Sequence, residues 1–170
     1  MRLACAILVG IASVGCGPTS ETGQVPRKAV DPSTAAAAHA VFLNRFVSAS
    51  SVELHSLSAA MTEAQWQSEM RALEGKDVAA VGCAYGDGST GGVSFLVMPC
   101  VFESAKDDVT LKASEAPQRL VVSLRVPIAG RVPAGPVRVV GRLKIGTVRR
   151  DTWLVAWGSV EDAEWESIDR

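Results

Sequence analysis

Three sulfur-bearing side chains, Cys83, Met98 and Cys100, are the residues of this chain whose types and spacing could do chemistry. In an oxidising compartment the two cysteines can form a disulfide, because extracytoplasmic proteins keep such bonds. They could equally remain as two buried free thiols. A third possibility is a soft-metal or redox site that uses the two thiols with Met98. The residue types leave these three interpretations open.

The predicted hairpin around the cysteines bears on the disulfide. Residues 77–85 and 93–98 have the composition of two strands, and the glycine-rich residues 86–92 read as the turn between them. A turn centred on Gly88 and Ser89 places Cys83 opposite Ser94. Cys100 then lies too far along the hairpin for bonding, unless the chain folds back after the second strand.

Catalytic and metal sites have little support in the sequence. The two histidines, His39 and His55, are sixteen residues apart, whereas structural zinc usually needs about four ligands and catalytic zinc three with a water. No nucleophile-elbow pattern occurs, and residues 86–92 lack the Lys-Ser/Thr that completes a phosphate-binding loop. The sequence therefore predicts a protein that is not an enzyme and has no cofactor and no metal.

Basic residues are frequent in the second half of the chain. With the strand residues Trp153 and Trp157, predicted to share one face, they resemble the cations and stacking aromatics of nucleic-acid sites. The chain has a formal net charge of −1, so solvated arginines and core tryptophans are the favoured interpretation and nucleic acid is an unlikely partner. The leading ligand-binding face is instead Arg138, Arg142 and Lys144, for an envelope protein, a glycan or anionic lipid. The full basic set is Arg119, Arg125, Arg131, Arg138, Arg142, Lys144, Arg149 and Arg150.

Helices must precede these strands. Residues 35–47 form a short apolar stretch with helical spacing that ends at the serines of residues 48–51. A second helix follows Thr62, which can form a capping box with Gln65, and Gly75 suits the end of this helical segment. Its apolar side should bury against the strands, and it carries Trp66, Met70 and Leu73.

The rest of the folded region is β. Besides the hairpin, residues 118–126, 137–145 and 151–157 have strand patterns. Five strands without strong helical crossovers predict a small antiparallel barrel. Gly82 and Gly141, each at the end of an alternating apolar run, should mark the bulges or bends that close it.

These segments resemble the oligonucleotide/oligosaccharide-binding (OB) barrel, through the LEGKDV of residues 73–78 and the GPVRVVG of residues 135–141. The order of Trp66, the LEGK segment, the FLVMP of residues 95–99 and Cys100 is similar to an uncharacterised family of exported bacterial proteins. That family often continues with cysteine, histidine or proline-rich positions, whereas this chain has VFESAKDD at residues 101–108. The resemblance implies a fold, not a ligand.

The N-terminus has the features of an export signal. Residues 3–12 are an apolar run after Met1 and Arg2, too short to cross a bilayer, which needs about 20 residues. The SVGC of residues 13–16 resembles the bacterial lipoprotein box, with Ser13 where a large aliphatic residue is usual. The resemblance implies fatty acylation at Cys16; the alternative is an ordinary secretory signal cut near Gly15 or Gly17.

Together these features predict an exported lipoprotein with a mainly β domain. Residues 1–15 are the signal peptide, 16–34 the lipidated cysteine and disordered tether, 35–75 the helical lead-in, 76–160 the OB-like barrel and 161–170 a tail. We expect a non-catalytic binding or accessory module of the cell envelope, anchored to a membrane through its lipid. That membrane is the outer membrane, facing the periplasm, in a Gram-negative cell, and otherwise the outer face of the cell membrane. The alternative is a small exported metal- or redox-handling protein using Cys83, Cys100 and Met98.

Overall fold

A computed structural model describes residues 32–86, 92–100, 113–130, 132, 135–150 and 152–168. The predicted signal peptide, Cys16 and most of the predicted tether lie outside these residues. Among the described residues, no helix is long and apolar enough to cross a membrane. Helix α1 begins at Pro32, inside the predicted tether, and ends at Ser48.

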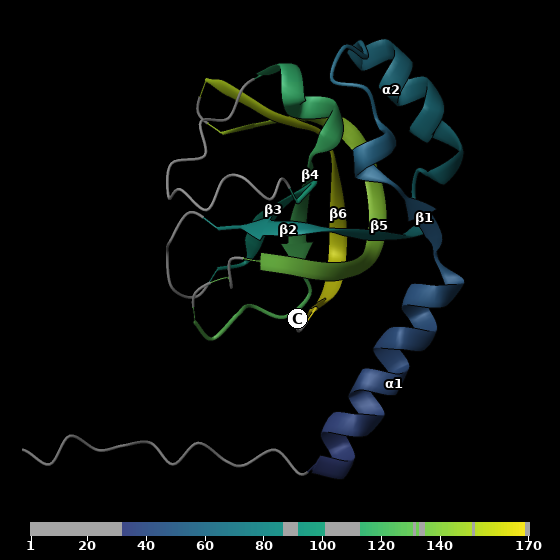
Figure 1. Ribbon diagram of the computed structural model, residues 1–170, viewed down its shortest axis with the longest axis vertical. Coiled ribbons are helices and arrows are strands. Elements are labelled where there is room, and N and C mark those ends of the chain that lie inside the picture. Colours follow the sequence, from purple (N-terminus) through teal and green to yellow (C-terminus); the bar gives the residue numbers. More distant parts are fainter. Residues whose placement is uncertain are drawn as a thin grey trace, which may run out of the picture. The chain divides into compact units, whose positions relative to one another are not determined.

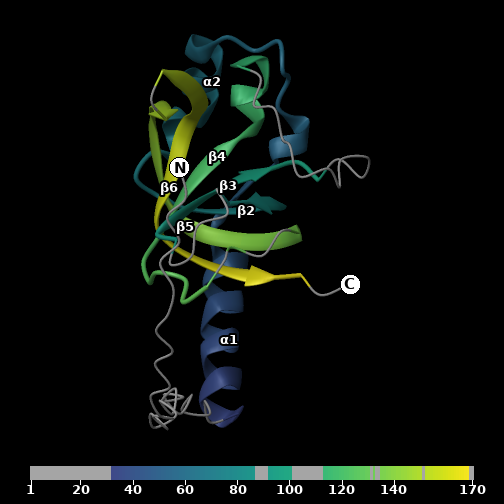
Figure 2. The same ribbon diagram turned by 90° about the vertical axis from the view of Figure 1, so that its left-hand side faces the viewer.

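The protein is mainly β (Figures 1 and 2). The helical elements are α1 (Pro32–Ser48), η1 (Leu54–Ser56), α2 (Glu63–Met70), η2 (Arg71–Leu73) and η3 (Ala113–Gln118). The strands are β1 (Ser50–Val52), β2 (Asp77–Tyr85), β3 (Ser94–Met98), β4 (Leu120–Leu124), β5 (Gly135–Arg150) and β6 (Trp153–Ser167). The first strand of the predicted hairpin, residues 77–85, is confirmed to the residue by β2.

The strands form one six-stranded mixed sheet in the order β1-β2-β3-β4-β6-β5, and an additional β2–β5 pairing joins β5 back to β2. The prediction of a five-stranded, wholly antiparallel barrel is wrong in two respects. The short strand β1 pairs in parallel with β2, and β4 pairs in parallel with β6. The ring is also closed unevenly, because β5 and β6 have 16 and 15 residues but β3 and β4 only five each.

The last two strands are longer than predicted. β6 continues to Ser167, so sheet extends beyond residue 160 into the segment predicted as a tail. Asp162 has a φ of 50°, and the β5–β6 register shifts between Val140 and Arg142. This bulge breaks the alternation of inward and outward residues, which is why the sequence pattern appeared to end early.

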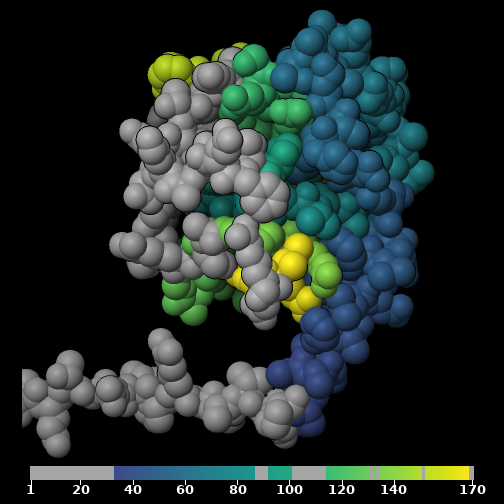
Figure 3. All heavy atoms as spheres, in the orientation of Figure 1, coloured from purple at the N-terminus to yellow at the C-terminus, as the bar shows by residue number. Residues whose placement is uncertain are grey.

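Helix α2 has the predicted capping box and packs against the sheet. The Thr62 side chain accepts from the Gln65 N–H, while the Gln65 side chain accepts from the Thr62 N–H. Trp66 is fully buried, and its indole Nε1 donates to the Pro117 carbonyl at 3.0 Å. The prediction that this helix buries its apolar side is therefore confirmed. Figure 3 shows α1, β1 and α2 as a continuous blue band along one side of the molecule.

The two strand glycines lie where the backbone is crowded. A Cβ on Gly82 would come within 2.6 Å of the Met98 carbonyl oxygen, and one on Gly141 within 2.7 Å of the Glu161 oxygen. Gly141 also coincides with the β5–β6 register shift. The predicted role of Gly141 at a bend is confirmed, and at both positions only a glycine lets neighbouring strands approach.

Candidate binding groove

Cys83 and Cys100 are joined by a disulfide, with their Cα atoms 4.9 Å apart. The predicted hairpin register was wrong. Cys83 pairs with Met98 rather than Ser94, and Tyr85 with Leu96. Cys100 is therefore only two residues beyond the strand partner of Cys83, which is close enough for a bond between the two cysteines. Met98 is buried in an apolar cluster with Leu96 and Val155. Among the described residues no group of three or more His, Cys, Asp or Glu side chains could hold a metal ion.

The basic face predicted to bind a ligand carries acidic partners. Lys144 Nζ lies 3.0 Å from Glu161 Oε1, and Arg142 Nη2 lies 3.6 Å from Asp162 Oδ2. The third residue, Arg138, pairs in register with Glu166. Sequence reasoning missed this mixed charge, because residues 161–167 were assigned to a tail and not to the strand beside β5.

Two further expectations for the basic and aromatic residues are corrected. Trp153 is 69% exposed near the β5–β6 turn, whereas Trp157 is 8% exposed and belongs to the core. The favoured interpretation of core tryptophans is therefore confirmed for Trp157 and wrong for Trp153. Arg119, expected to face solvent, is 1% exposed and pairs with Glu115 one helical turn before it. Its burial lowers the pKa of the Arg119 guanidinium.

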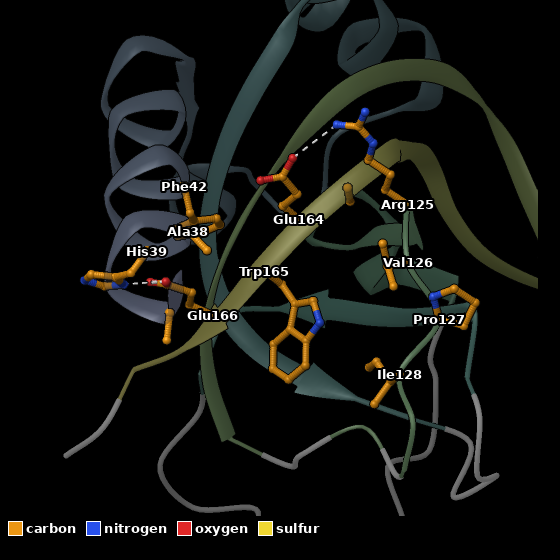
Figure 4. A pocket seen from close by; sticks show the side chains of 12 residues that line it. Ala38, His39, Phe42, Arg125, Val126, Pro127, Ile128, Glu164, Trp165 and Glu166 are labelled. Carbon is orange, nitrogen blue, oxygen red and sulfur yellow. Dashed lines mark hydrogen bonds and ion pairs between the residues drawn. The ribbon is translucent and has the colours of Figure 1, made fainter. Parts of the chain in front are cut away.

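A groove of about 480 Å³ lies between α1, β6 and the segment that follows β4. Figure 4 shows its walls, with Ala38, His39 and Phe42 on α1, residues 125–128 on the other side, and Glu164, Trp165 and Glu166 on β6. Phe42 is 4% exposed, and the Trp165 ring packs edge-on against Phe95 with ring centroids 5.8 Å apart. Phe42 and Trp165 therefore join the groove wall to the buried core.

The carboxylates beside the groove have side-chain partners within the protein. His39 Nδ1 contacts Glu166 Oε1, and Figure 4 shows the pairs of both Glu166 and Glu164. Arg45 Nη1 donates to Glu164 Oε1 at 3.0 Å, and Arg125 Nη1 lies 3.5 Å from the same oxygen. These charged side chains therefore already have partners within the protein. The rest of the groove lining is largely apolar.

Arg45 also fixes α1 to the start of β2. Its Nε and Nη2 donate to the two carboxylate oxygens of Asp77. These hydrogen bonds lower the pKa of the Asp77 carboxyl and raise the pKa of the Arg45 guanidinium. The arrangement stabilises α1 in the position that forms one groove wall.

Sequence reasoning did not identify this groove. Its lining comes from residues 35–42, 125–128 and 163–166, which meet only because β6 returns beside β4. The available signal was the spacing of Ala35, Ala38 and Phe42 on one helical face, but of these three only Phe42 is buried.

Comparisons with known proteins give one structural similarity. No family model matches the chain, and no curated protein matches it. The crystal structure of a DUF3299 family protein from Pseudomonas aeruginosa PAO1 is similar, with a TM-score of 0.43 and 12% sequence identity. The similarity covers 72% of this chain and 99% of that chain.

Proposed function

We propose that this protein is an exported lipoprotein whose OB-like domain is a non-catalytic binding or accessory module of the cell envelope. A lipid on Cys16 is its membrane anchor. The observation that carries this proposal is the Cys83–Cys100 disulfide. Disulfides persist in exported proteins and are rare in the reducing cytosol, so the bond supports the export that is predicted from a signal peptide at residues 1–15.

The strand pairings support the OB-like assignment. Leaving β1 aside, the ring β2-β3-β4-β6-β5 closes through the β2–β5 pairing. An OB fold is a five-stranded, partly open Greek-key barrel, and a ring of five strands with uneven closure is compatible with that description. The crowded glycines Gly82 and Gly141 provide the close contacts that such a small ring needs.

The groove is a better binding surface than the basic face of Arg138, Arg142 and Lys144. On that face two of the three cations already contact carboxylates of β6. The groove combines a concave surface with apolar side chains, and it leaves Val126 73% exposed at its border. Concave, largely apolar surfaces with a few polar groups are typical of binding sites.

Cell fractionation with cysteine variants tests the anchor. We expect the wild-type chain and a Cys5→Ser control to be acylated and found with the membranes. A Cys16→Ser variant should lack the lipid and leave the membrane fraction once its signal is removed. A wild-type chain recovered from the cytosol without acylation would contradict the proposal.

Photo-crosslinking in cells tests the binding surface. A photoreactive residue at Val126, beside the groove, should give a specific adduct with an envelope component. The same residue at Val47, which is 81% exposed on α1 and does not line the groove, should not. Equal adducts at both positions would contradict the assignment of the groove.

A further inference from the structure

We infer that the groove binds an extended peptide segment of a partner protein, which adds as a strand to the free edge of β6 at Trp165 and Ser167. The inference rests on the proposed binding function of the groove and names its partner class. Strand addition uses main-chain hydrogen bonds for affinity and side-chain contacts for specificity.

The edge of β6 becomes free where β4 leaves it. The last β4–β6 pair is Leu124 with Ala163, after which the Arg125 N–H donates to the Ala163 carbonyl at 3.0 Å. The chain then turns away, and the Ile128 N–H donates to the Gly92 carbonyl at 3.1 Å. Within the described part of the chain, no strand pairs with β6 on this side beyond Ala163.

The backbone groups of two residues face this free edge. Along a strand, the N–H and C=O of one residue point to the same side, and successive residues alternate. The Ala163 carbonyl points toward β4, so the groups of Trp165 and Ser167 point the same way. The Ile168 N–H donates to the Pro136 carbonyl at 2.9 Å. The backbone groups of the residues that alternate with Trp165 and Ser167 therefore point toward β5.

The groove follows the same edge. Ala163, Glu164, Trp165 and Glu166 form one border of the groove, and residues 125–128 form the border opposite. A strand laid along the edge would therefore place its side chains against these walls. Unpaired strand edges are templates for pairing with another chain.

The walls indicate the chemistry of the segment. Phe42, Val126 and Ile128 are apolar, and the carboxylates of Glu164 and Glu166 already contact Arg45, Arg125 and His39. An uncharged segment with apolar residues at alternate positions fits this lining. Because α1 and residues 125–128 border the edge on two sides, a single strand enters more easily than the folded sheet of a second copy.

The test starts from a phage library of random ten-residue peptides, selected on the membrane-extracted full chain. The peptide selected most often is then synthesised, together with analogues that have N-methyl groups at alternate residues. Both alternate sets are made, because each analogue keeps every side chain but loses the N–H donors on only one edge of the extended peptide, and the analogue methylated on the edge that faces β6 is the one that counts. We expect it to bind at least about tenfold more weakly, because each lost hydrogen bond removes roughly a fivefold factor.

Two matched pairs of variants test the position. Ser167→Pro removes an edge N–H that makes no bond to β5, and Ser167→Ala retains it, so only the proline variant should lose at least about fivefold in affinity. Ala38→Glu places a charge in the groove, whereas Ala37→Glu adds the same charge at an exposed position that does not line it. Only Ala38→Glu should weaken binding.

Amide hydrogen exchange gives an independent readout. The Trp165 and Ser167 amides should exchange fast in the free chain and at least about tenfold more slowly with the peptide. The inference is overturned by an empty selection, by analogues that both bind as well as their parent, or by edge amides already protected through self-association of the chain. The state of Cys16 is measured separately, so failure of the anchor would not be confused with failure of the groove.

Discussion

Arg45 of α1 holds Asp77 of β2 through two hydrogen bonds, from Nε to Oδ2 at 2.7 Å and from Nη2 to Oδ1 at 2.9 Å. Such two-point pairs fix geometry as well as charge. Most α1 side chains are exposed, including Val41 at 67%, and Phe42 is the buried one among those described. The attachment of α1 therefore depends on Phe42 and on polar contacts, which are this pair and the contacts of Arg45 with Glu164 and His39 with Glu166.

The Arg45–Asp77 pair predicts an acid-sensitive contribution to stability. The pKa of Asp77 is lowered by hydrogen bonding from Arg45, so its stabilisation is fully present above the ordinary aspartate range and is lost as pH falls through the lowered pKa. Asp77→Asn should reduce the melting temperature at neutral pH and flatten its decline in acid. Thermal unfolding across acidic to neutral pH measures this. Asp162→Asn, in an exposed pair with Arg142, serves as the control, and an equal effect of both variants would contradict the role of Asp77.

Gly158 is predicted to be intolerant of any side chain. A Cβ at this position would lie 2.4 Å from Trp66 Cη2 and 3.3 Å from the Lys144 carbonyl oxygen. Gly158→Ala should lower the free energy of unfolding by about 2 kcal/mol, because overpacking a dense core displaces its neighbours. Denaturant unfolding measures the loss. Gly130→Ala, where a Cβ meets nothing within 4 Å, should change it little; similar losses would refute the packing argument.

The indole N–H of Trp66 gives a second stability prediction. Trp66→Phe leaves the buried Pro117 carbonyl without its donor and removes part of a fully buried ring. We expect a loss of about 2–3 kcal/mol, from the unsatisfied acceptor and the small cavity. Trp153→Phe, at a position 69% exposed, should cost less than about 0.5 kcal/mol. Chemical unfolding measures the free energy of unfolding of both variants. Equal losses of stability in the two variants would contradict the role given to the Trp66 indole.

The disulfide predicts a redox-dependent stability. Cys83 and Cys100 are 17 residues apart in the chain, and closing a loop of this size in the unfolded chain contributes about 3 kcal/mol. Reductant should lower the unfolding midpoint of the wild-type chain. It should have no effect on the Cys83→Ala/Cys100→Ala double variant, whose stability should match that of the reduced wild type. If reductant also lowered the unfolding midpoint of the double variant, the effect could not come from the Cys83–Cys100 bond.

Local sequence patterns predicted local structure well. The capping box of Thr62 and Gln65 and the bounds of β2 depend on neighbours in the chain, and both agree with the structure. The parallel pairing of β4 with β6 could not be read from periodicity, since β5 lies between them in sequence. Strand periodicity also failed at Asp162, where the bulge shifts one residue out of step.

The prediction of a basic binding face was incomplete for the same reason, because the full extent of β6 was not recognised. Arg142 and Lys144 were recognised as outward residues of a strand, but their partners Glu161 and Asp162 lay beyond the predicted end of the sheet. The groove joins residues from three distant segments. The position of the groove depends on which strands are neighbours in the sheet. Composition and residue spacing contain little information about strand neighbours.

The intact mass of the membrane-extracted chain tests the central proposal most directly, because it reports the N-terminus and the thiols together. We predict a chain that begins at an acylated Cys16 and is lighter by two hydrogen atoms than its reduced form, through the Cys83–Cys100 bond. A chain that begins at Met1, carries no lipid and has both thiols free would contradict the account of an exported, anchored binding module.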